Sequence, residues 1–486
     1  MMANSNRNII TETGVNKMIN LCLIGLGLHA KRIYIGYCKK YNIKPKLIIE
    51  LDSFENETKK YLKELGWEDI CCYFIKSKYR DYRFLPMGES RKLKKIIKTL
   101  KITHSIISTE PKGHNMWCDF FMKNNIHVLT DKPITVYDNM LDRKCINLLL
   151  KDYNRLLTLQ RKHNVQCKVM CQRMYHMGYM YIRNLVEDMI KTYNIPITYM
   201  NIYHCDGKWN MPHEYNSLES HPYKFGYGKM FHSGYHFIDL ASSLLNLNNF
   251  TDETKHMKSI NMMATFRTPS DELNSTNVDD YKRFFDALPE EYERGFNFEN
   301  NGERDCCINM ECRNKNNKVI SLVNLNLLQS GFSRRSWLKS KKDTYKGNGR
   351  LRHESLVIQM GSLMSIHVHS YQSKEISERT DDECSFGGLE HYDIDIYRNV
   401  GIIGGKPFER IKLKDLVTDR IKNFIGYNEY AREEGINHFL KNDTEKGELK
   451  HHKLAMKMVY NYCLILKNFH KDKKQQIKFK IGDVNG

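Results

Sequence analysis

The sequence predicts an α/β protein in which a doubly wound parallel sheet is followed by an α+β domain with a large, open and mostly antiparallel sheet. Strand-like and helix-like stretches alternate up to residue 160, which favours parallel strands. Beyond residue 260 strand-like stretches follow one another without helices between them, which favours antiparallel pairing. A length of 486 residues suits two domains. We place the first at residues 18–160 and the second at residues 161–486.

Composition is typical of a globular chain, with 41% hydrophobic and 11% aromatic residues. No apolar run approaches the roughly 20 residues of a membrane helix, and residues 1–18 form a polar leader without an apolar signal core. The 14 cysteines are scattered and include no C-x-x-C unit. We therefore expect free thiols in a reducing compartment, a cytoplasmic protein without a membrane partner, and no metal site.

The net charge of +19 raises the question of a nucleic-acid partner. Lysines are spread along the whole chain, and their short runs fit solvated helix faces. No nucleic-acid-binding fold accompanies them, so we expect no such partner. An anionic substrate would use the same electrostatic field.

A glycine turn lies between the first strand-like stretch, residues 20–24, and a helix-like stretch at residues 31–40. The arrangement is G-x-G-x-x-A, which in this context is the fingerprint of a dinucleotide-binding Rossmann domain. Gly25 permits the tight turn, Gly27 lets a pyrophosphate approach the backbone, and Ala30 lets the helix pack closely on the strand. The helix N-terminus favours the negative charge of the pyrophosphate. Candidate cofactor-binding residues in the turn are Gly25, Gly27, Leu28, His29 and Ala30.

The second strand-like stretch, residues 46–51, is followed by Asp52. An acid at this place accepts hydrogen bonds from the ribose hydroxyls of a dinucleotide. With Glu55 nearby, the region disfavours a 2′-phosphate, so we expect NAD rather than NADP. The alternative is that Asp52 only caps the next helix.

Two further strands end in polar residues. The stretch 103–108 leads into Thr109-Glu110-Pro111-Lys112-Gly113-His114, and, after a helix at residues 115–123, the stretch 127–130 leads into Asp131-Lys132-Pro133. Ligands of parallel sheets bind at the carboxyl ends of the strands. Further candidates for cofactor binding are therefore Ser108, Thr109, Glu110, His114, Asp131 and Lys132.

This second pair of segments resembles the Gfo/Idh/MocA family of glucose-fructose oxidoreductases and inositol dehydrogenases. The family's strand usually ends in Glu-Lys-Pro, so Asp131 is a conservative departure, and Glu110 stands where the family often has proline. The resemblance implies that Lys132 lies between the nicotinamide and the substrate. The alternative is a surface lysine before a turn proline.

Residues 165–173 read as a strand and residues 178–191 as a helix, where the family begins its second domain. The family often has an arginine facing the site near Arg173. We consider Arg173 a candidate for binding substrate or cofactor, with a buried salt bridge as the alternative.

A histidine stripe follows in Gly228-Lys-Met-Phe-His232-Ser-Gly234-Tyr-His236-Phe-Ile-Asp239. On a helix His232, His236 and Asp239 share one face, where they suit proton transfer. Two histidines four residues apart also suit zinc, but no third ligand is evident. The stretch resembles the family signature that places the catalytic histidine at His236 and its following acid at Asp239. The family has an aspartate where this chain has His232, a candidate substrate contact.

The rest of the second domain contains strand-like stretches at residues 261–267, 307–312 and 319–328 and a last helix at residues 449–468. Polar insertions lie near residues 269–304 and 339–350. Trp337 is a candidate substrate contact, with a solvated hairpin end as the alternative.

These features together predict a dehydrogenase that acts on CH–OH groups and transfers a hydride between NAD(P) and a secondary alcohol or ketone. His236, oriented by Asp239, is the expected base, and Lys132 stabilises the alkoxide. The resemblance implies a sugar, cyclitol or sugar derivative as the polyhydroxylated substrate, and a homodimer or homotetramer. The alternatives are a glycosidase that retains NAD through a transient oxidation and a non-catalytic NAD-binding regulator or scaffold.

Overall fold

The computed structural model describes residues 19–218, 221–338, 349–373, 391–416, 427–443 and 446–482. The chain forms two compact units. The first comprises Met1–Val136, Lys151–Gln172 and Ala431–His451, and the second comprises Tyr137–Leu150, Arg173–Tyr430 and His452–Gly486. The polar leader, residues 1–18, lies outside the described residues.

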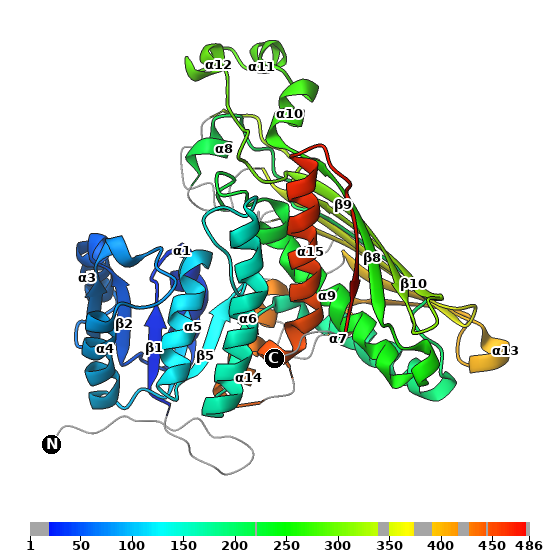
Figure 1. The fold of residues 1–486 in the computed structure, drawn as a ribbon, viewed down its shortest axis with the longest axis horizontal. Coiled ribbons are helices and arrows are strands. Elements are labelled where there is room, and N and C mark those ends of the chain that lie inside the picture. Colours follow the sequence, from blue (N-terminus) through cyan, green and yellow to red (C-terminus); the bar gives the residue numbers. More distant parts are fainter. Residues whose placement is uncertain are drawn as a thin grey trace. The chain divides into compact units, whose positions relative to one another are not determined.

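The first unit is built on six parallel strands in the order β3-β2-β1-β4-β5-β6, drawn in blue to cyan in Figure 1. This sheet confirms the predicted Rossmann-like architecture. β1 is buried along its whole length, as a central strand of a parallel sheet requires. The strands are β1 (Leu21–Ile24), β2 (Leu47–Leu51), β3 (Cys71–Ile75), β4 (His104–Ile107), β5 (His127–Asp131) and β6 (Cys167–Met170).

Helices connect these strands, as the alternating pattern of the sequence predicts. The first connection continues from α1 through a π-helical turn, Lys31–Ile35, into α2, so it is one helical run. The connecting helices are α1 (Leu28–Ala30), α2 (Gly36–Lys40), α3 (Glu55–Glu64), α4 (Met87–Thr99), α5 (His114–Lys123) and α6 (Arg143–His163). A later helix, α14 (Tyr427–Leu440), also contributes to this unit, and both α6 and α14 are divided between the two units.

The first sheet extends further along the chain than the sequence analysis suggests. β6 pairs in parallel with β5, from Val128 opposite Cys167 to Asp131 opposite Met170. The strand that we assigned to the start of the second domain is therefore the sixth strand of the first sheet. A short buried strand shows the same apolar pattern in either sheet, so its sequence does not reveal its neighbour.

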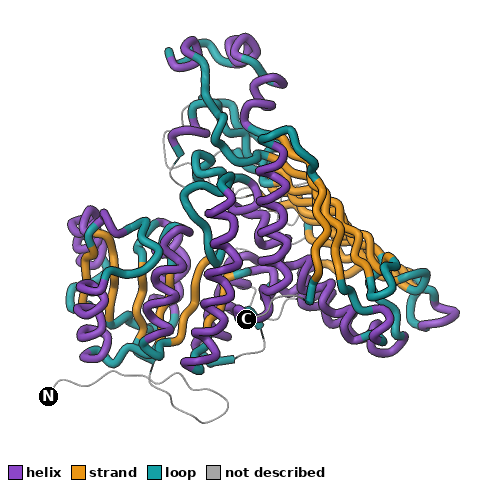
Figure 2. The backbone as a smooth tube through the Cα atoms, in the orientation of Figure 1, coloured by secondary structure: helices purple, strands orange, loops and turns teal. Residues whose placement is uncertain are grey.

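The second unit is built on nine strands in the order β14-β13-β12-β11-β7-β10-β9-β8-β15. Among the described strands of this sheet, β7 and β10 pair in parallel and the other neighbours pair antiparallel, so the sheet is mostly antiparallel, as predicted. Figure 2 shows helices on one side of this sheet. The strands are β7 (Tyr199–Cys205), β8 (Ser259–Arg267), β9 (Asp305–Arg313), β10 (Val319–Leu328), β11 (Leu351–Met360), β12 (Met364–Ser373), β13 (Tyr392–Arg398), β14 (Phe408–Lys412) and β15 (Gln476–Lys480).

Alternate residues of this sheet point into the core, as in β10, where Val323, Leu325 and Leu327 are buried. α9 and α15 pack against each other on the covered face. The helices are α7 (Met177–Tyr193), α8 (Glu214–Ser217), α9 (Tyr235–Leu245), α10 (Pro269–Ser275), α11 (Val278–Phe284), α12 (Glu291–Arg294), α13 (Val400–Ile403) and α15 (Lys453–Phe469).

The predicted insertion near residues 269–304 contains α10, α11 and α12. Capping boxes start α10 at Thr268 and α11 at Asn277. Tyr281 and Tyr292 are buried in an apolar cluster with Met211, which fixes the insertion to the second unit. Residues 339–348 of the other predicted insertion lie outside the described residues.

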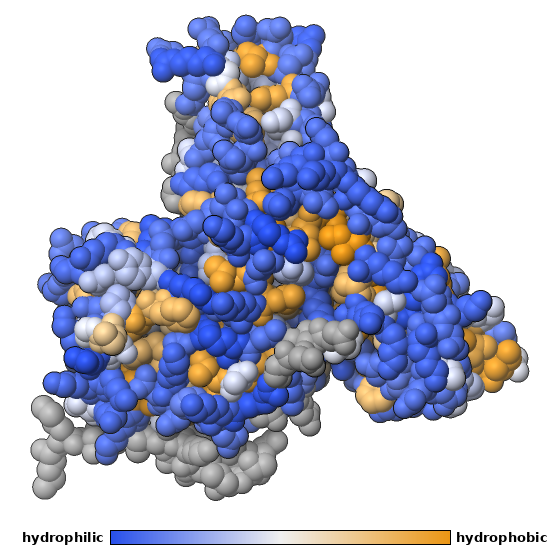
Figure 3. Space-filling view, in the orientation of Figure 1, coloured by the Kyte–Doolittle hydropathy of each residue, from blue (hydrophilic) through white to orange (hydrophobic). Residues whose placement is uncertain are grey.

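The visible surface is mainly hydrophilic, with scattered apolar patches, in Figure 3. This agrees with a mean hydropathy of −0.60. None of the described helices combines the length and the apolar composition that spanning a membrane requires.

Candidate functional site

The glycine turn at the end of β1 contains one glycine that the fold needs and one that it does not. Gly25 has a φ of +83°, and a Cβ there would lie 2.6 Å from the carbonyl oxygen of Ser108. Gly27 has a φ of −70°, and no atom lies within 4 Å of the place where its Cβ would stand. Gly25 therefore allows β1 and β4 to approach, while Gly27 leaves open space before the helix. Ala30 is fully buried beneath the turn.

Glu50, at the end of β2, holds the glycine turn in place. One of its carboxylate oxygens accepts a hydrogen bond of 2.6 Å from the backbone N–H of Leu26, and the other accepts one of 2.8 Å from the N–H of Leu51. Sequence analysis did not identify this residue, because the strand pattern does not show which acid bends back to the turn. The next N–H groups begin the helix, where Leu28 is exposed.

Asp52 lies directly after β2, as predicted. Its Oδ1 accepts hydrogen bonds from the N–H and the hydroxyl of Ser77, at 2.9 and 2.6 Å. These bonds, with the hydroxyl contact the larger, lower the pKa of Asp52. Lys76 lies 3.5 Å from Oδ2, while Glu55 pairs with Lys59 instead of adding to the charge at Asp52. The acid is thus ionised but close to a cation.

Asp131 contacts several of the predicted residues at the carboxyl ends of β4 and β5. It accepts hydrogen bonds from the hydroxyls of Tyr34, at 2.5 Å, and Ser108, at 2.7 Å. Nε2 of His29 lies 3.7 Å from it, but burial lowers the pKa of His29 to about 4, so this imidazole is neutral at pH 7. The next residue, Lys132, is half-buried and is joined to Pro133 by a cis peptide bond.

His114, at the start of α5, links the two polar segments. Its Nδ1 lies 2.6 Å from the carbonyl oxygen of Pro133, and its Nε2 lies 3.2 Å from that of Thr109. Burial lowers the pKa of this histidine. Glu110 pairs with Arg80. The structure thus connects His114 to the segment that carries Lys132, and gives Glu110 a structural partner.

In the second unit the histidine stripe runs from a π-helical turn, Met230–Gly234, into α9. Gly228 lies just before this turn, and a Cβ there would lie 2.0 Å from the carbonyl oxygen of Glu303, so only glycine fits. His232 is buried, and its Nε2 lies 3.0 Å from the carbonyl oxygen of Pro222. His236 is half-buried at the start of α9.

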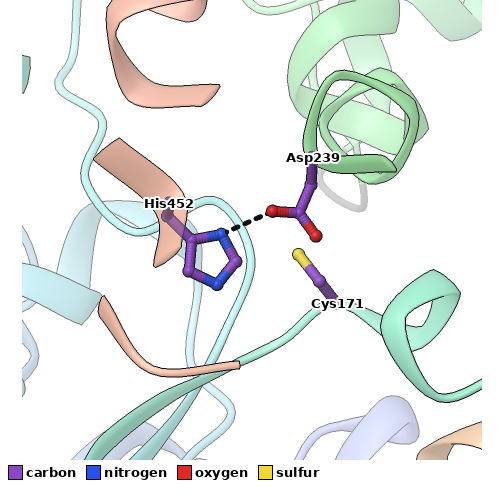
Figure 4. A group of neighbouring side chains, drawn as sticks. All are labelled: Cys171, Asp239 and His452. Carbon is purple, nitrogen blue, oxygen red and sulfur yellow. Dashed lines mark ion pairs between the residues drawn. The ribbon is translucent and has the colours of Figure 1, made fainter. Parts of the chain in front are cut away.

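Asp239 pairs with a residue that sequence analysis did not identify. Its Oδ1 lies 2.8 Å from Nδ1 of His452, and both side chains are buried. Figure 4 shows the imidazole of His452 directed at this carboxylate. The stripe had suggested that Asp239 orients His236. The ion pair shows that this carboxylate fixes the segment that precedes α15, while its orientation of His236 stays a prediction.

Two other candidates from the sequence have structural partners. Arg173 forms a buried ion pair with Glu354, in which both side chains are 2% exposed, and it donates to Asn428. This geometry matches the buried salt bridge that was the alternative for Arg173. Trp337 is half-buried, and its carbonyl oxygen accepts a hydrogen bond of 2.7 Å from Arg335.

A pocket of about 660 Å³ lies in the second unit at the ends of β8 and β10. Two arginines line it, but both are paired. Arg304 contacts Glu272, and Arg267 lies 3.0 Å from Glu272 and 3.9 Å from Asp305. The pocket therefore offers no unpaired arginine charge to a ligand.

No protein-family model and no curated protein matches the sequence. Solved structures do resemble the fold. An oxidoreductase from Pseudomonas syringae has a TM-score of 0.55 at 12% identity, with 96% of this chain and 100% of that chain covered. A putative NADPH-dependent oxidoreductase from Desulfitobacterium hafniense has a TM-score of 0.53 at 13% identity, with 97% and 100% covered.

A third structure, an oxidoreductase from Agrobacterium radiobacter in complex with NAD+, L-tartaric acid and magnesium, has a TM-score of 0.52 at 10% identity, with 96% of this chain and 98% of that chain covered. At these identities the likeness establishes the fold of both units.

Proposed function

We propose that the chain is a nicotinamide-dependent oxidoreductase of the Gfo/Idh/MocA type, acting on the CH–OH group of a sugar, cyclitol or sugar derivative. The observation that carries the proposal is the glycine turn, with Gly27 facing open space at a helix start, at the carboxyl edge of a parallel sheet. The oxidoreductases of the same fold support it, since one is a complex with NAD+ and another is named NADPH-dependent.

The residues of the first unit fit a dinucleotide. The missing Cβ of Gly27 leaves room for a pyrophosphate beside the first N–H groups of the helical run. Asp52 is ionised and suits the ribose hydroxyls of NAD, whose binding we propose over that of NADP. Ser108, Thr109 and His114 lie along the same edge of the sheet, where a bound dinucleotide extends.

Lys132 and His236 are the proposed catalytic residues. A bound nicotinamide accepts or donates the hydride. The ammonium group of Lys132 donates a hydrogen bond to the substrate oxygen and stabilises its developing negative charge. The imidazole of His236 takes the hydroxyl proton during oxidation and returns it during reduction. Asp239, three residues after His236 on α9, is the proposed positioning residue for this base, and its carboxylate also holds His452. We also propose a cytoplasmic homodimer or homotetramer, as the resemblance implies.

The test is turnover of added NAD+ with a panel of sugars, sugar alcohols and cyclitols, followed by the near-ultraviolet absorbance of NADH. Once a substrate is found, Lys132→Ala and His236→Ala are each expected to lower kcat by about 10²–10⁴-fold, the usual contribution of a positioned acid, base or oxyanion donor. Lys95→Ala, which removes an exposed lysine of α4, is the matched control and should retain full activity.

Either catalytic variant with unchanged kcat would contradict its assigned role. Tight dinucleotide binding without turnover on any member of the panel would favour a non-catalytic regulator. Cleavage of a glycosidic bond without net formation of NADH would favour a glycosidase that retains its cofactor.

A further inference from the structure

A cluster of charged residues lies at one end of β7 and β11 in the second unit. The two strands are antiparallel neighbours, with His204 opposite Glu354. Asp206 follows β7, and Arg352 belongs to β11. Gly207 allows the close approach of the two segments, since its φ is +59° and a Cβ there would lie 1.7 Å from the carbonyl oxygen of Leu351. We call Asp206, Lys208, Lys229, Arg350 and Arg352 the Asp206 cluster.

Asp206 is the only carboxylate of this cluster, and its oxygens already have partners. Oδ2 accepts hydrogen bonds from Lys229, at 2.7 Å, and from Ser233, at 2.5 Å. Arg350 pairs with Oδ1 and also donates to the backbone carbonyl of Asp206 at 3.0 Å. Two cations and one hydroxyl therefore occupy the carboxylate oxygens of the single acid.

The neighbouring charges do not supply a second anion. Glu354 forms its own buried ion pair with Arg173 and accepts a bond of 3.1 Å from Tyr179. His204 accepts a hydrogen bond from Lys229 at Nδ1, and burial lowers the pKa of its imidazole well below the usual range, so it is neutral. The charge of Glu354 is therefore neutralised by Arg173, and His204 carries no charge.

Among the described residues, no carboxylate pairs directly with Lys208 or Arg352, although Asp206 attracts both from a greater distance. Both are half-buried, and within the described part of the chain neither side chain forms a hydrogen bond or an ion pair. Burial, followed by repulsion from Arg350, lowers the pKa of Lys208 to about 7 and that of Arg352 to about 9. When all four basic side chains are protonated, the single carboxylate leaves a formal charge of +3 on the cluster. Such an excess is unfavourable in a partly buried place unless an anion compensates it.

The cluster is also tied to the helix that carries the proposed base. Ser233, which donates to Asp206, lies one helical turn before His236. Lys229 is the N-cap residue of the π-helical turn that contains Ser233. The Asp206 cluster therefore contacts the π-helical turn that leads into α9, the helix that carries His236.

We propose that Lys208 and Arg352 bind an anionic group, a carboxylate or a phosphate, of the substrate. That the anion belongs to a substrate rests on the proposed function. The anion site itself is independent of dinucleotide binding. Arg352 offers a planar fork of donors and Lys208 a point charge, a pair that suits the oxygens of either anion. The substrate is accordingly a sugar acid, a sugar phosphate or a related acidic polyol rather than a neutral sugar.

The test measures anion binding to the full chain in the absence of dinucleotide, with inorganic phosphate and acetate as separate probes at constant ionic strength. Isothermal titration is performed on the wild type and on Lys208→Met, Arg352→Met and Lys318→Met. The last variant removes an exposed lysine of the β9–β10 turn, so it carries the same change of net charge as Lys208→Met. Each cluster variant should weaken binding by about tenfold or more, because it removes one charge-assisted contact.

Stability provides a second readout that a merely structural role would not give. Without added anion, Lys208→Met should have a Tm equal to or above that of the wild type, because it removes an unpaired cation. Added anion should then raise its Tm less than that of the wild type. The probe that binds more tightly identifies the class of anion.

Binding of neither probe to the wild type, or equal binding to all four proteins, would overturn the inference. A failure of dinucleotide binding with the anion site intact would instead overturn only the proposed function.

Discussion

Replacing the two glycines of the turn one at a time should separate folding from cofactor binding. Gly25→Ala places a methyl group 2.6 Å from the carbonyl oxygen and 2.9 Å from the carbonyl carbon of Ser108. Both are backbone atoms of the segment after β4, so relief requires β1 and β4 to move apart. Gly27→Ala places the same methyl group in open space.

The expected magnitudes follow from this geometry. A positive φ costs an L residue roughly 1–2 kcal/mol, and overpacking costs about 1–3 kcal/mol. Gly25→Ala should therefore lower the stability of the first unit by about 2–5 kcal/mol, or its Tm by roughly 4–20 °C. Gly27→Ala should leave stability unchanged or raise it by about 0.4–1 kcal/mol, because its φ of −70° suits alanine.

Differential scanning calorimetry of the two variants, with and without NAD+, is the assay. Without NAD+, Gly27→Ala should have the same Tm as the wild type. Added NAD+ should raise its Tm much less than that of the wild type, because its methyl group occupies the space beside the pyrophosphate. A normal Tm for Gly25→Ala would refute the assigned packing. Undiminished protection of Gly27→Ala by NAD+ would refute the assigned pyrophosphate position.

Three further predictions concern other parts of the chain. Arg173→Met should lower the free energy of unfolding, measured with urea, by about 3–5 kcal/mol, because it leaves Glu354 buried and unpaired. Adding Glu354→Leu should restore much of this stability. Equal losses in the single and double variants would contradict the pairing. Burial raises the pKa of Glu303 to about 7, so wild-type stability should fall by about 1.4 kcal/mol per unit as the pH rises from near 4.5 to 7. Glu303→Gln should not show this loss of stability with rising pH. Parallel profiles of stability against pH for the variant and the wild type would contradict the role of Glu303. Asp52→Ser should raise the affinity for NADP+ relative to NAD+ in fluorescence titrations, because Lys76 remains beside the site. An unchanged ratio of the two dissociation constants would contradict a contact between Asp52 and the ribose.

The sequence predicted those parts of the fold that local patterns encode. The glycine turn, β2, β4, α5 and β5 follow from apolar runs next to glycine, acid and proline residues, and the structure places them close to their expected bounds. β10 occupies the expected residues. The order of strands could not be read in the same way, because pairing joins segments far apart in the chain. The strand β6 was therefore placed at the start of the second domain, although it pairs with β5 in the first sheet.

Candidate site residues could be proposed from the sequence only where they lie in one contiguous motif. His232, His236 and Asp239 were recognised together because they lie within one short helical stretch. The partner of Asp239, His452, is brought in by a distant segment that carries no signal of its own. The Asp206 cluster likewise depends on the pairing of β7 with β11, which no local pattern reveals.

Binding of the dinucleotide to the full chain tests the central claim most directly. Titration calorimetry with NAD+, NADH and NADP+ should give saturable binding of one dinucleotide per chain, tighter for NAD+ than for NADP+ and weakened in Gly27→Ala without loss of folding. Absence of binding by all three dinucleotides to the folded protein would contradict the account.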